Sequence, residues 1–172
     1  NLAARLQSMT FGDHLEVEAE YYLPKDKEKE KKLLKHSDRK KLPIDAVKVL
    51  RAPVGPEGKK IPIAKFSYEE DHTDVRDVEG CLTRYHHDGK KLKRIDYFDL
   101  DDQRVCSTQF LWNGNYLKAK VFVNQTGIPH FSKVFHFDAS GNVLRELLYG
   151  NSTGEATHPF KLNSDGSLSH AE

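Results

Sequence analysis

Hydrophobic and polar positions alternate with a period of two along much of the chain, most clearly in its second half. In Tyr116–Val123 the apolar positions Leu117, Ala119, Val121 and Val123 share one side, and Lys118 and Lys120 take the other. In His130–Phe137 the odd-numbered positions hold three phenylalanines and a lysine, opposite His130, Ser132, Val134 and His136. A helix would scatter these residues around its circumference, whereas a strand sorts them onto two faces. The pattern therefore predicts β-strands.

Turn signals punctuate these strands at steps of about 11–14 residues. They are Asp88-Gly89, Asn113-Gly114, Thr126-Gly127, Ser140-Gly141, Thr153-Gly154 and Asp165-Gly166, with Asp102-Gln103 as a degenerate copy without glycine. Glycine tolerates the positive φ of tight hairpin turns, and a preceding Asn or Asp favours them. Short connections pair each strand with the next. We predict an all-β protein, an antiparallel β-meander of repeated hairpins that forms an elongated open sheet.

The first eighty residues are less regular. Alternation there predicts strands at His14–Tyr22, which has one charged face, at Ala46–Leu50 and at Ile61–Tyr68. We expect Asp77–Tyr85 to form a hairpin with the segment before it, and residues 1–8 to form a short helix or an arm. The chain divides into N-terminal strands over 1–79 and the hairpin-repeat region over 80–172, which we interpret as parts of one continuous domain.

Residues 25–41 differ from their surroundings because they hold nine Lys or Arg against four acidic residues. The stretch is compatible with a short charged helix or with a solvated loop. Its function is equally open at this point. It is a solvated excursion between strands, or a basic patch that attracts phosphate-rich polymers or anionic lipid headgroups.

Composition narrows the class of protein. A charged fraction of 31% favours a thin sheet with much of each strand in water. The net charge of +1 argues against a nucleic-acid binder. Two cysteines, Cys81 and Cys106, are too few for a disulfide framework and are typical of a reducing compartment. No stretch approaches the ~20 apolar residues of a membrane span. We expect a cytoplasmic location, with the inner membrane surface as an alternative.

Motifs for catalysis do not stand out. The P-loop, the nucleophile elbow and the dinucleotide-binding glycine pattern do not occur. His130 and His136 are too far apart on one strand to chelate one ion. The acidic cluster of Asp96, Asp99, Asp101 and Asp102 is interpreted as turn capping rather than as a calcium loop. We therefore predict no catalytic, cofactor-binding or metal-ligating residues and no cofactor.

Aromatic residues are the more promising feature, several per predicted strand. Most are expected to form the packing surface of the sheet, in its core or facing a partner. Trp112 and Tyr116, beside the Asn113-Gly114 turn, and Tyr97 are the candidates for contact with a sugar or a partner protein. A broad sheet with apolar residues on both faces also favours self-association.

Two segments carry a resemblance to a known family. Asp96-Tyr97-Phe98-Asp99 and the run Phe137-Asp138-Ala139-Ser140-Gly141-Asn142-Val143-Leu144 resemble the repeats of an extended β-sheet domain. That domain is inserted in retaining, two-Rossmann-domain glycosyltransferases of Gram-positive bacteria that act on wall teichoic acid or serine-rich adhesins. The resemblance covers roughly residues 80–150. It implies a β-meander that supports oligomerisation, partner binding or docking of a polymer or protein acceptor.

The catalytic half of that family is not recognisable here. Its E-x7-E pair is matched in spacing only by Glu20 and Glu28, which straddle Pro24 and lack a glycine-rich context, so no catalytic residue is carried over. The chain does not begin with Met, and we expect it to be a non-catalytic piece of a longer glycosyltransferase. The alternatives are a free-standing β-repeat module that binds protein or glycan, and a small β-barrel enzyme or ligand carrier.

Overall fold

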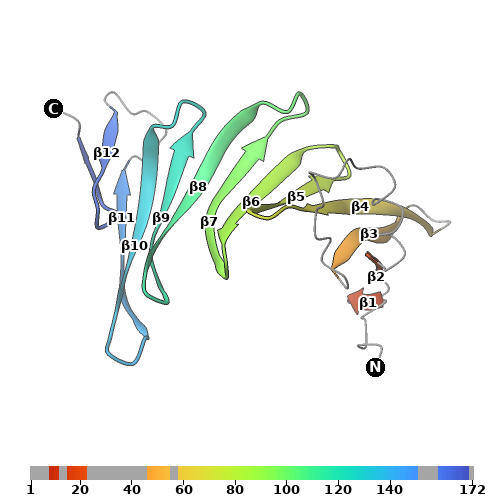
Figure 1. The fold of residues 1–172 in the computed structure, drawn as a ribbon, viewed down its shortest axis with the longest axis horizontal. Coiled ribbons are helices and arrows are strands. Elements are labelled where there is room, and N and C mark those ends of the chain that lie inside the picture. The colour runs from red at the N-terminus through yellow and green to blue at the C-terminus, as the bar shows by residue number, and fades with distance from the viewer. Residues whose placement is uncertain (1–7, 12–14, 23–45, 55–57, 151–158, 171–172) are drawn as a thin grey trace, which may run out of the picture. The chain divides into compact units, whose positions relative to one another are not determined.

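The computed structural model describes residues 8–11, 15–22, 46–54, 58–150 and 159–170. Eleven strands follow one another in sequence order, from β1 to β11, in one antiparallel sheet, and β12 and β13 form a separate two-stranded sheet (Figure 1). The all-β class and the meander are thereby confirmed, and the sheet is open because its order has two ends. The predicted helix or loop at 25–41 and the turn at Thr153-Gly154 lie outside the described residues.

The chain divides into two compact units, with the boundary in the sequence between Leu82 and Thr83. The first unit contains β1 (Ser8–Phe11), β2 (Leu15–Tyr21), β3 (Val47–Val54), β4 (Lys59–Tyr68) and β5 (His72–Asp77). The strands from that boundary onward are β6 (Leu82–Asp88), β7 (Lys91–Phe98), β8 (Arg104–Asn113), β9 (Tyr116–Asn124), β10 (Pro129–Phe137), β11 (Val143–Gly150), β12 (Phe160–Leu162) and β13 (Leu168–His170). The part of the chain that the structure describes contains no helix that could cross a membrane.

In the first unit the charged face of β2 meets complementary charges on β3 and β4. Glu20 pairs with Lys48 at 3.3 Å and with Arg51 at 3.2 Å, and Lys60 pairs with Glu16 at 3.2 Å. The hydrogen bond from Lys60 holds the pKa of Glu16 below its usual value. Such partly exposed pairs each contribute little to stability, but the opposite charges of Glu20 on β2 and of Lys48 and Arg51 on the neighbouring β3 favour one register.

In the second unit the buried face of the sheet is made of small side chains. Ala119 pairs with Leu111 and Val134, and Val121 pairs with Ser132. Ala119, Val121 and Ser132 are fully buried, and Val123 and Val134 are 5% exposed. This confirms the predicted alternation in the second half of β9 and from Phe131 onward in β10, whereas a register shift at His130 interrupts it at the start of β10. Neighbouring phenylalanines take the opposite face, where Phe122 is 44% exposed.

A β-bulge changes the predicted alternation at the start of β9. Leu111 pairs with Ala119 and Trp112 pairs with Leu117, which leaves Lys118 as an extra residue. An extra residue shifts the alternation by one position. Leu117 therefore shares a face with Trp112 rather than with Ala119, and the predicted grouping of Leu117 with the later apolar residues is wrong. The hairpin of β6 and β7 repeats this irregularity, since Arg94 pairs with His86 and Leu92 with His87.

Most of the predicted turn signals belong to a recurrent five-residue loop. Its first residue donates its backbone N–H to the carbonyl of the fifth at 2.9–3.1 Å, and the fourth donates to the carbonyl of the first at 3.0–3.3 Å. The fourth residue has positive φ, between 57° and 96°. The loops span residues 77–81, 99–103, 124–128, 138–142 and 163–167. The signals Asp88-Gly89 and Asn113-Gly114 instead mark two-residue turns, formed by Gly89-Lys90 and Gly114-Asn115, and Asp88 and Asn113 are the last residues of their strands.

An Asp or Asn side chain completes four of these loops. Its Oδ1 accepts the backbone N–H groups of the third and fifth residues at 2.8–3.0 Å, in the loops that begin at Asp77, Asp99, Asn124 and Asp138. Local bonds of this kind are the reason for the preference for Asp and Asn in turns. Hydrogen bonds from Asn142 hold the pKa of Asp138 below its usual value. Asp99 thus caps a turn, as the sequence indicated.

The hairpin of β12 and β13 packs on the buried face of the larger sheet, where it contacts β10 and β11. At the tip of this hairpin, a Cβ atom added to Gly166 would lie 2.4 Å from the Cβ atom of Ala119. The buried hydroxyl of Ser132 donates to the Gly166 carbonyl. Glycine is required here both for the close approach and for its φ of 91°.

A substitution at Gly127 tests the need for positive φ separately from any steric clash, because no atom lies within 4 Å of the added Cβ. We expect Gly127→Ala to lower the free energy of unfolding by about 1–2 kcal/mol, since an L-residue with positive φ is strained. The exposed neighbour Gln125→Ala is the matched control and should change it by less than about 0.5 kcal/mol. Urea denaturation measures both. Equal stability of the two variants would contradict the role of φ.

Candidate functional site

The three aromatic residues predicted from the sequence do not form one site. Tyr97 pairs with Thr83 and Cys106, next to the loop that begins at Asp99. Trp112 and Tyr116 lie at the other end of β8 and β9, beside the two-residue turn. Cys106 and Trp112 are six residues apart on one strand, or about 20 Å. One small ligand therefore cannot contact all three side chains.

Trp112 and Tyr116 are each engaged within the protein. The indole Nε1 of Trp112 donates to the Leu92 carbonyl at 2.7 Å, and the Lys91 Nζ lies 5.9 Å from the ring centroid. The Tyr116 ring lies 5.1 Å from that of Phe137 and remains 47% exposed. Tyr116 is the more accessible of the two for contact with a partner.

A buried polar cluster on β6, β7 and β8 was not anticipated from the sequence. The Asp96 side chain, in a residue only 3% exposed, accepts hydrogen bonds from Ser107 Oγ at 2.6 Å and from Arg94 Nε at 3.0 Å. His86 Nε2 lies 2.8 Å from Asp96 Oδ2 and 3.1 Å from Arg94 Nη2. Antiparallel pairing explains the cluster, because Asp96 lies opposite Ser107 and Arg94 lies opposite His86.

The cluster keeps Asp96 ionised. Burial raises the pKa of its carboxyl, but the hydrogen bonds from Ser107 and His86 and the charge of Arg94 outweigh it, so the pKa lies below the usual 3.8. A buried carboxylate without such donors would instead favour the neutral form. Asp96 is therefore a fixed negative charge that holds the Arg94 guanidinium in place. It does not belong to the exposed turn with which the sequence grouped it.

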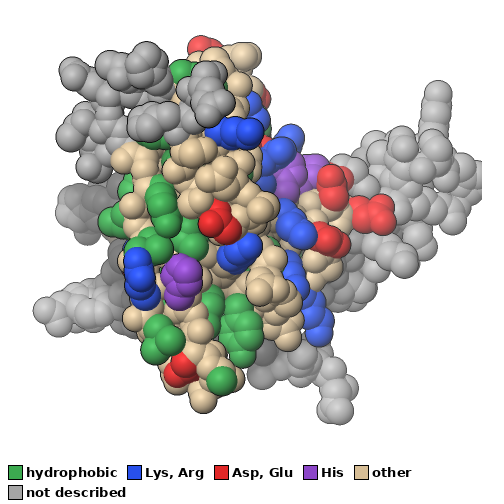
Figure 2. Space-filling view, turned by 90° about the vertical axis from the view of Figure 1, so that its left-hand side faces the viewer, with side chains coloured by type: hydrophobic (Ala, Val, Ile, Leu, Met, Phe, Trp, Pro, Cys, Tyr) green, Lys and Arg blue, Asp and Glu red, His purple; other side chains and the backbone are tan. Residues whose placement is uncertain are grey.

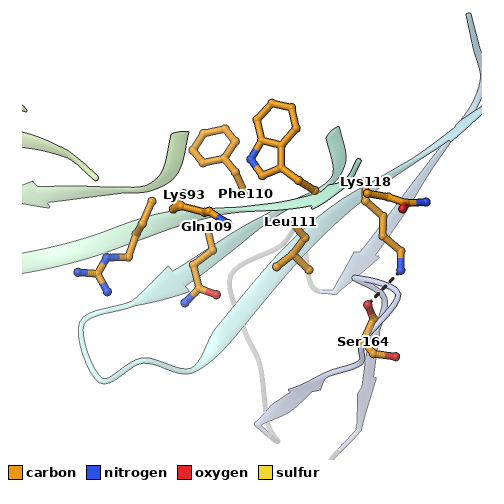
Figure 3. A pocket seen from close by; sticks show the side chains of 9 residues that line it. Lys93, Gln109, Phe110, Leu111, Lys118 and Ser164 are labelled. Carbon is orange, nitrogen blue, oxygen red and sulfur yellow. Dashed lines mark hydrogen bonds between the residues drawn. The ribbon is translucent and has the colours of Figure 1, made fainter. Parts of the chain in front are cut away.

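A groove of about 660 Å³ lies between the sheet and the C-terminal hairpin (Figure 3). Its lining comprises Lys93, Arg94, Gln109, Phe110, Leu111, Trp112, Asn113, Lys118 and Ser164. Gln109, Leu111 and Lys118 point toward the side of the sheet where Ser164 lies, whereas the Phe110 ring points away from it (Figure 3). Lys118 Nζ donates to the Ser164 carbonyl at 3.1 Å and so joins the sheet to the hairpin.

The groove lining is basic. Lys93, Arg94 and Lys118 contribute three positive charges, and none of the described residues that line it is Asp or Glu. Carboxylates lie close by: Asp96 is 2.9 Å from Arg94, and Asp88, which is highly exposed, is 3.6 Å from Lys93. Hydrogen bonds from Ser167 lower the pKa of Asp165, and the positive charge of Lys118 lowers it further.

A sequence signal for the groove exists, although sequence reasoning did not use it. Both two-residue turns begin the same pattern, a glycine followed three and four residues later by Leu and Lys, in Gly89-Lys-Lys-Leu-Lys93 and Gly114-Asn-Tyr-Leu-Lys118. In each hairpin the final lysine is the extra residue of the β-bulge. Bulges redirect side chains, and both of these lysines line the groove.

The comparisons with known proteins add no functional assignment, since neither a protein-family model nor a curated protein sequence matches this chain.

The Asp96 cluster predicts a pH-dependent contribution to stability. Because the folded pKa is lowered, the ionised carboxylate stabilises the fold above about pH 3.8 and this contribution is lost as the pH falls through the folded pKa. We expect Asp96→Asn to lower the free energy of unfolding by roughly 1–3 kcal/mol at neutral pH. The difference in the free energy of unfolding between wild type and variant should become smaller as the pH falls below about 3.8.

Denaturation of the wild type and the variant at several pH values measures this difference. Asp101→Asn, in the exposed turn, is the control and should have little effect at any pH. A deficit for Asp96→Asn that stays constant down to about pH 2 would exclude a lowered pKa as its cause.

Proposed function

We propose that this chain is the non-catalytic β-sheet domain of a bacterial retaining glycosyltransferase, in which it provides contacts for oligomerisation, partner binding or acceptor docking. The two segments that carry the family resemblance support this proposal. Phe98-Asp99 and Phe137-Asp138 both lead into the five-residue loop with the same backbone and side-chain hydrogen bonds. The two segments therefore occupy equivalent positions in the repeat of this chain, as expected for a repetitive β-sheet domain.

The main support for a role in contacts comes from β11, the last strand of the eleven-stranded sheet. It pairs with β10 along one side, and no described strand pairs with its other side. Its side chains Val143, Leu144 and Leu148 are 50%, 70% and 62% exposed. Hydrophobic side chains are exposed at this end of the protein in Figure 2. An edge strand with unpaired backbone groups is a template for pairing with another chain, and exposed apolar side chains beside the charged Arg145 and Glu146 favour such a contact.

The occupant that we propose for this edge is a second copy of the chain. In such a dimer, β11 of one copy would pair antiparallel with β11 of the other. The contact would be isologous, as it is in most twofold dimers. A net charge of +1 gives little repulsion between two copies. Within a glycosyltransferase, such pairing would bring together the catalytic domains of two subunits.

A double substitution tests this edge. We expect Leu144→Lys with Leu148→Lys to weaken self-association at least about tenfold, because two charges on each copy would meet at the contact. Light scattering coupled to size exclusion, over a range of protein concentrations, measures the mass. Leu100→Lys is a matched control, because Leu100 is 67% exposed in the loop after β7 and lies away from the edge.

A wild-type chain that remains monomeric at every concentration would refute pairing through β11. The wider proposal has its own test in the full-length enzyme. Deletion of this domain should abolish glycosylation of the acceptor and leave hydrolysis of the sugar donor intact. Loss of both activities together would contradict a role restricted to contacts.

The basic groove favours a second candidate, a free-standing module that binds a glycan or a protein. This alternative needs no catalytic domain, because the ligand site would be complete within residues 83–172. It predicts a reading frame that ends close to this chain, whereas the glycosyltransferase proposal predicts flanking nucleotide-binding domains.

A further inference from the structure

We propose that the groove between β7–β9 and the C-terminal hairpin binds a phosphate ester of about the size of a sugar phosphate. This inference concerns a different surface from the β11 edge. It holds whether or not the chain self-associates and whether or not it belongs to a glycosyltransferase.

The first step is the placement of the two lysines. Lys93 and Lys118 are the extra residues of equivalent bulges in successive hairpins, and both line the groove. A bulge requires an additional residue but no particular side chain. The backbone therefore does not require lysine at either position, and both side chains place a positive charge at the groove, Lys118 while it donates to the Ser164 carbonyl.

The second step is the fixed orientation of Arg94. Its guanidinium is held by Asp96 through Nε at 3.0 Å and Nη2 at 2.9 Å, yet the side chain is still 41% exposed. A guanidinium that is already oriented loses less conformational freedom when a ligand binds. Because Asp96 already occupies Nε and Nη2, a phosphate oxygen would be contacted through the N–H groups of Nη1.

The third step concerns the charge of the ligand. Asp96 and Asp88 lie within 4 Å of Arg94 and Lys93, and the exposed Asp165 interacts with Lys118, so these carboxylates offset part of the attraction of the groove for an anion. A single negative charge therefore gains little, whereas a phosphate monoester carries nearly two charges at neutral pH and has three acceptor oxygens. The groove accordingly favours phosphate over carboxylate.

The fourth step concerns the size of the ligand. A volume of about 660 Å³ falls within the range of small-molecule sites and far exceeds that of one inorganic phosphate. The remaining lining offers the amides of Gln109 and Asn113 and the apolar side chain of Leu111. Amides bind hydroxyl groups and an apolar side chain packs against a sugar ring, so the organic part of the ligand is a polyol or a sugar.

The most direct test introduces a negative charge without changing shape. Gln109→Glu should weaken the binding of glucose 6-phosphate at least about tenfold, because the new carboxylate repels the phosphate. Amide chemical shifts of the whole chain, titrated at low ionic strength, measure the affinity. Glucose itself should bind at least about tenfold more weakly than its phosphate.

Paired lysine substitutions locate the site. Lys93→Gln with Lys118→Gln should weaken binding about tenfold. Lys91→Gln with Lys120→Gln is the matched control, since it removes the same charge from the same two strands. These lysines lie over the rings of Trp112 and Phe110 and do not line the groove. The control should bind within about twofold of the wild type, and thermal unfolding verifies that each variant folds.

A lipid headgroup is a second source of the same phosphate chemistry. Sedimentation with phosphatidylcholine vesicles that contain phosphatidylglycerol distinguishes it from a soluble ester. Binding to vesicles that Gln109→Glu abolishes would identify a headgroup, and binding of glucose 6-phosphate that it abolishes would identify a soluble ligand. The proposal is overturned if neither probe binds, if Gln109→Glu binds as the wild type does, or if both lysine pairs weaken binding equally.

Discussion

A chain that reverses direction at the edge of a single sheet must satisfy backbone N–H groups without help from a second layer of structure. The five-residue loop meets this constraint locally. One Asp or Asn oxygen accepts two N–H groups, and two backbone bonds close the ring. The fourth residue must then adopt positive φ, which explains the glycines and the tolerated Asp102. Because each loop is complete in itself, hairpins can be added in series without a common core.

The second consequence of a thin sheet is an unusual core. Small side chains such as Ala119 and Ser132 are fully buried, whereas Phe122 is 44% exposed on the opposite face. The tip of the C-terminal hairpin approaches so closely that only Gly166 fits against Ala119. A larger residue at Ala119 would displace this hairpin. The size of the buried residues is therefore set by the hairpin that covers them and not by the volume of a conventional core.

The sequence predicted the features that depend on local chemistry. Turn signals such as Thr126-Gly127 and the alternation of Val121 and Val123 need only neighbouring residues, and both were predicted. The pairing of each strand with the next was also predicted, but features that depend on the register between strands were missed. The bulge at Lys118 inserts one residue that periodicity cannot reveal, so Leu117 was assigned to the wrong face. Asp96 was grouped with the turn that follows it, because its partners Ser107 and His86 become neighbours only when the strands align.

The same distinction separates the positions that hold the sheet together from those available for recognition. Loop residues such as Asn124 and buried residues such as Val121 are fixed by hydrogen bonds and by close packing, so they leave little freedom for a binding surface. A bulge lysine and an exposed leucine of an edge strand are not packed into the buried face, although Lys118 also donates to the Ser164 carbonyl of the hairpin. Lys93, Lys118 and Leu144 can therefore be chosen for what they contact outside the sheet. A repeat of this kind keeps its register through the loops and acquires specificity at its bulges and its edges.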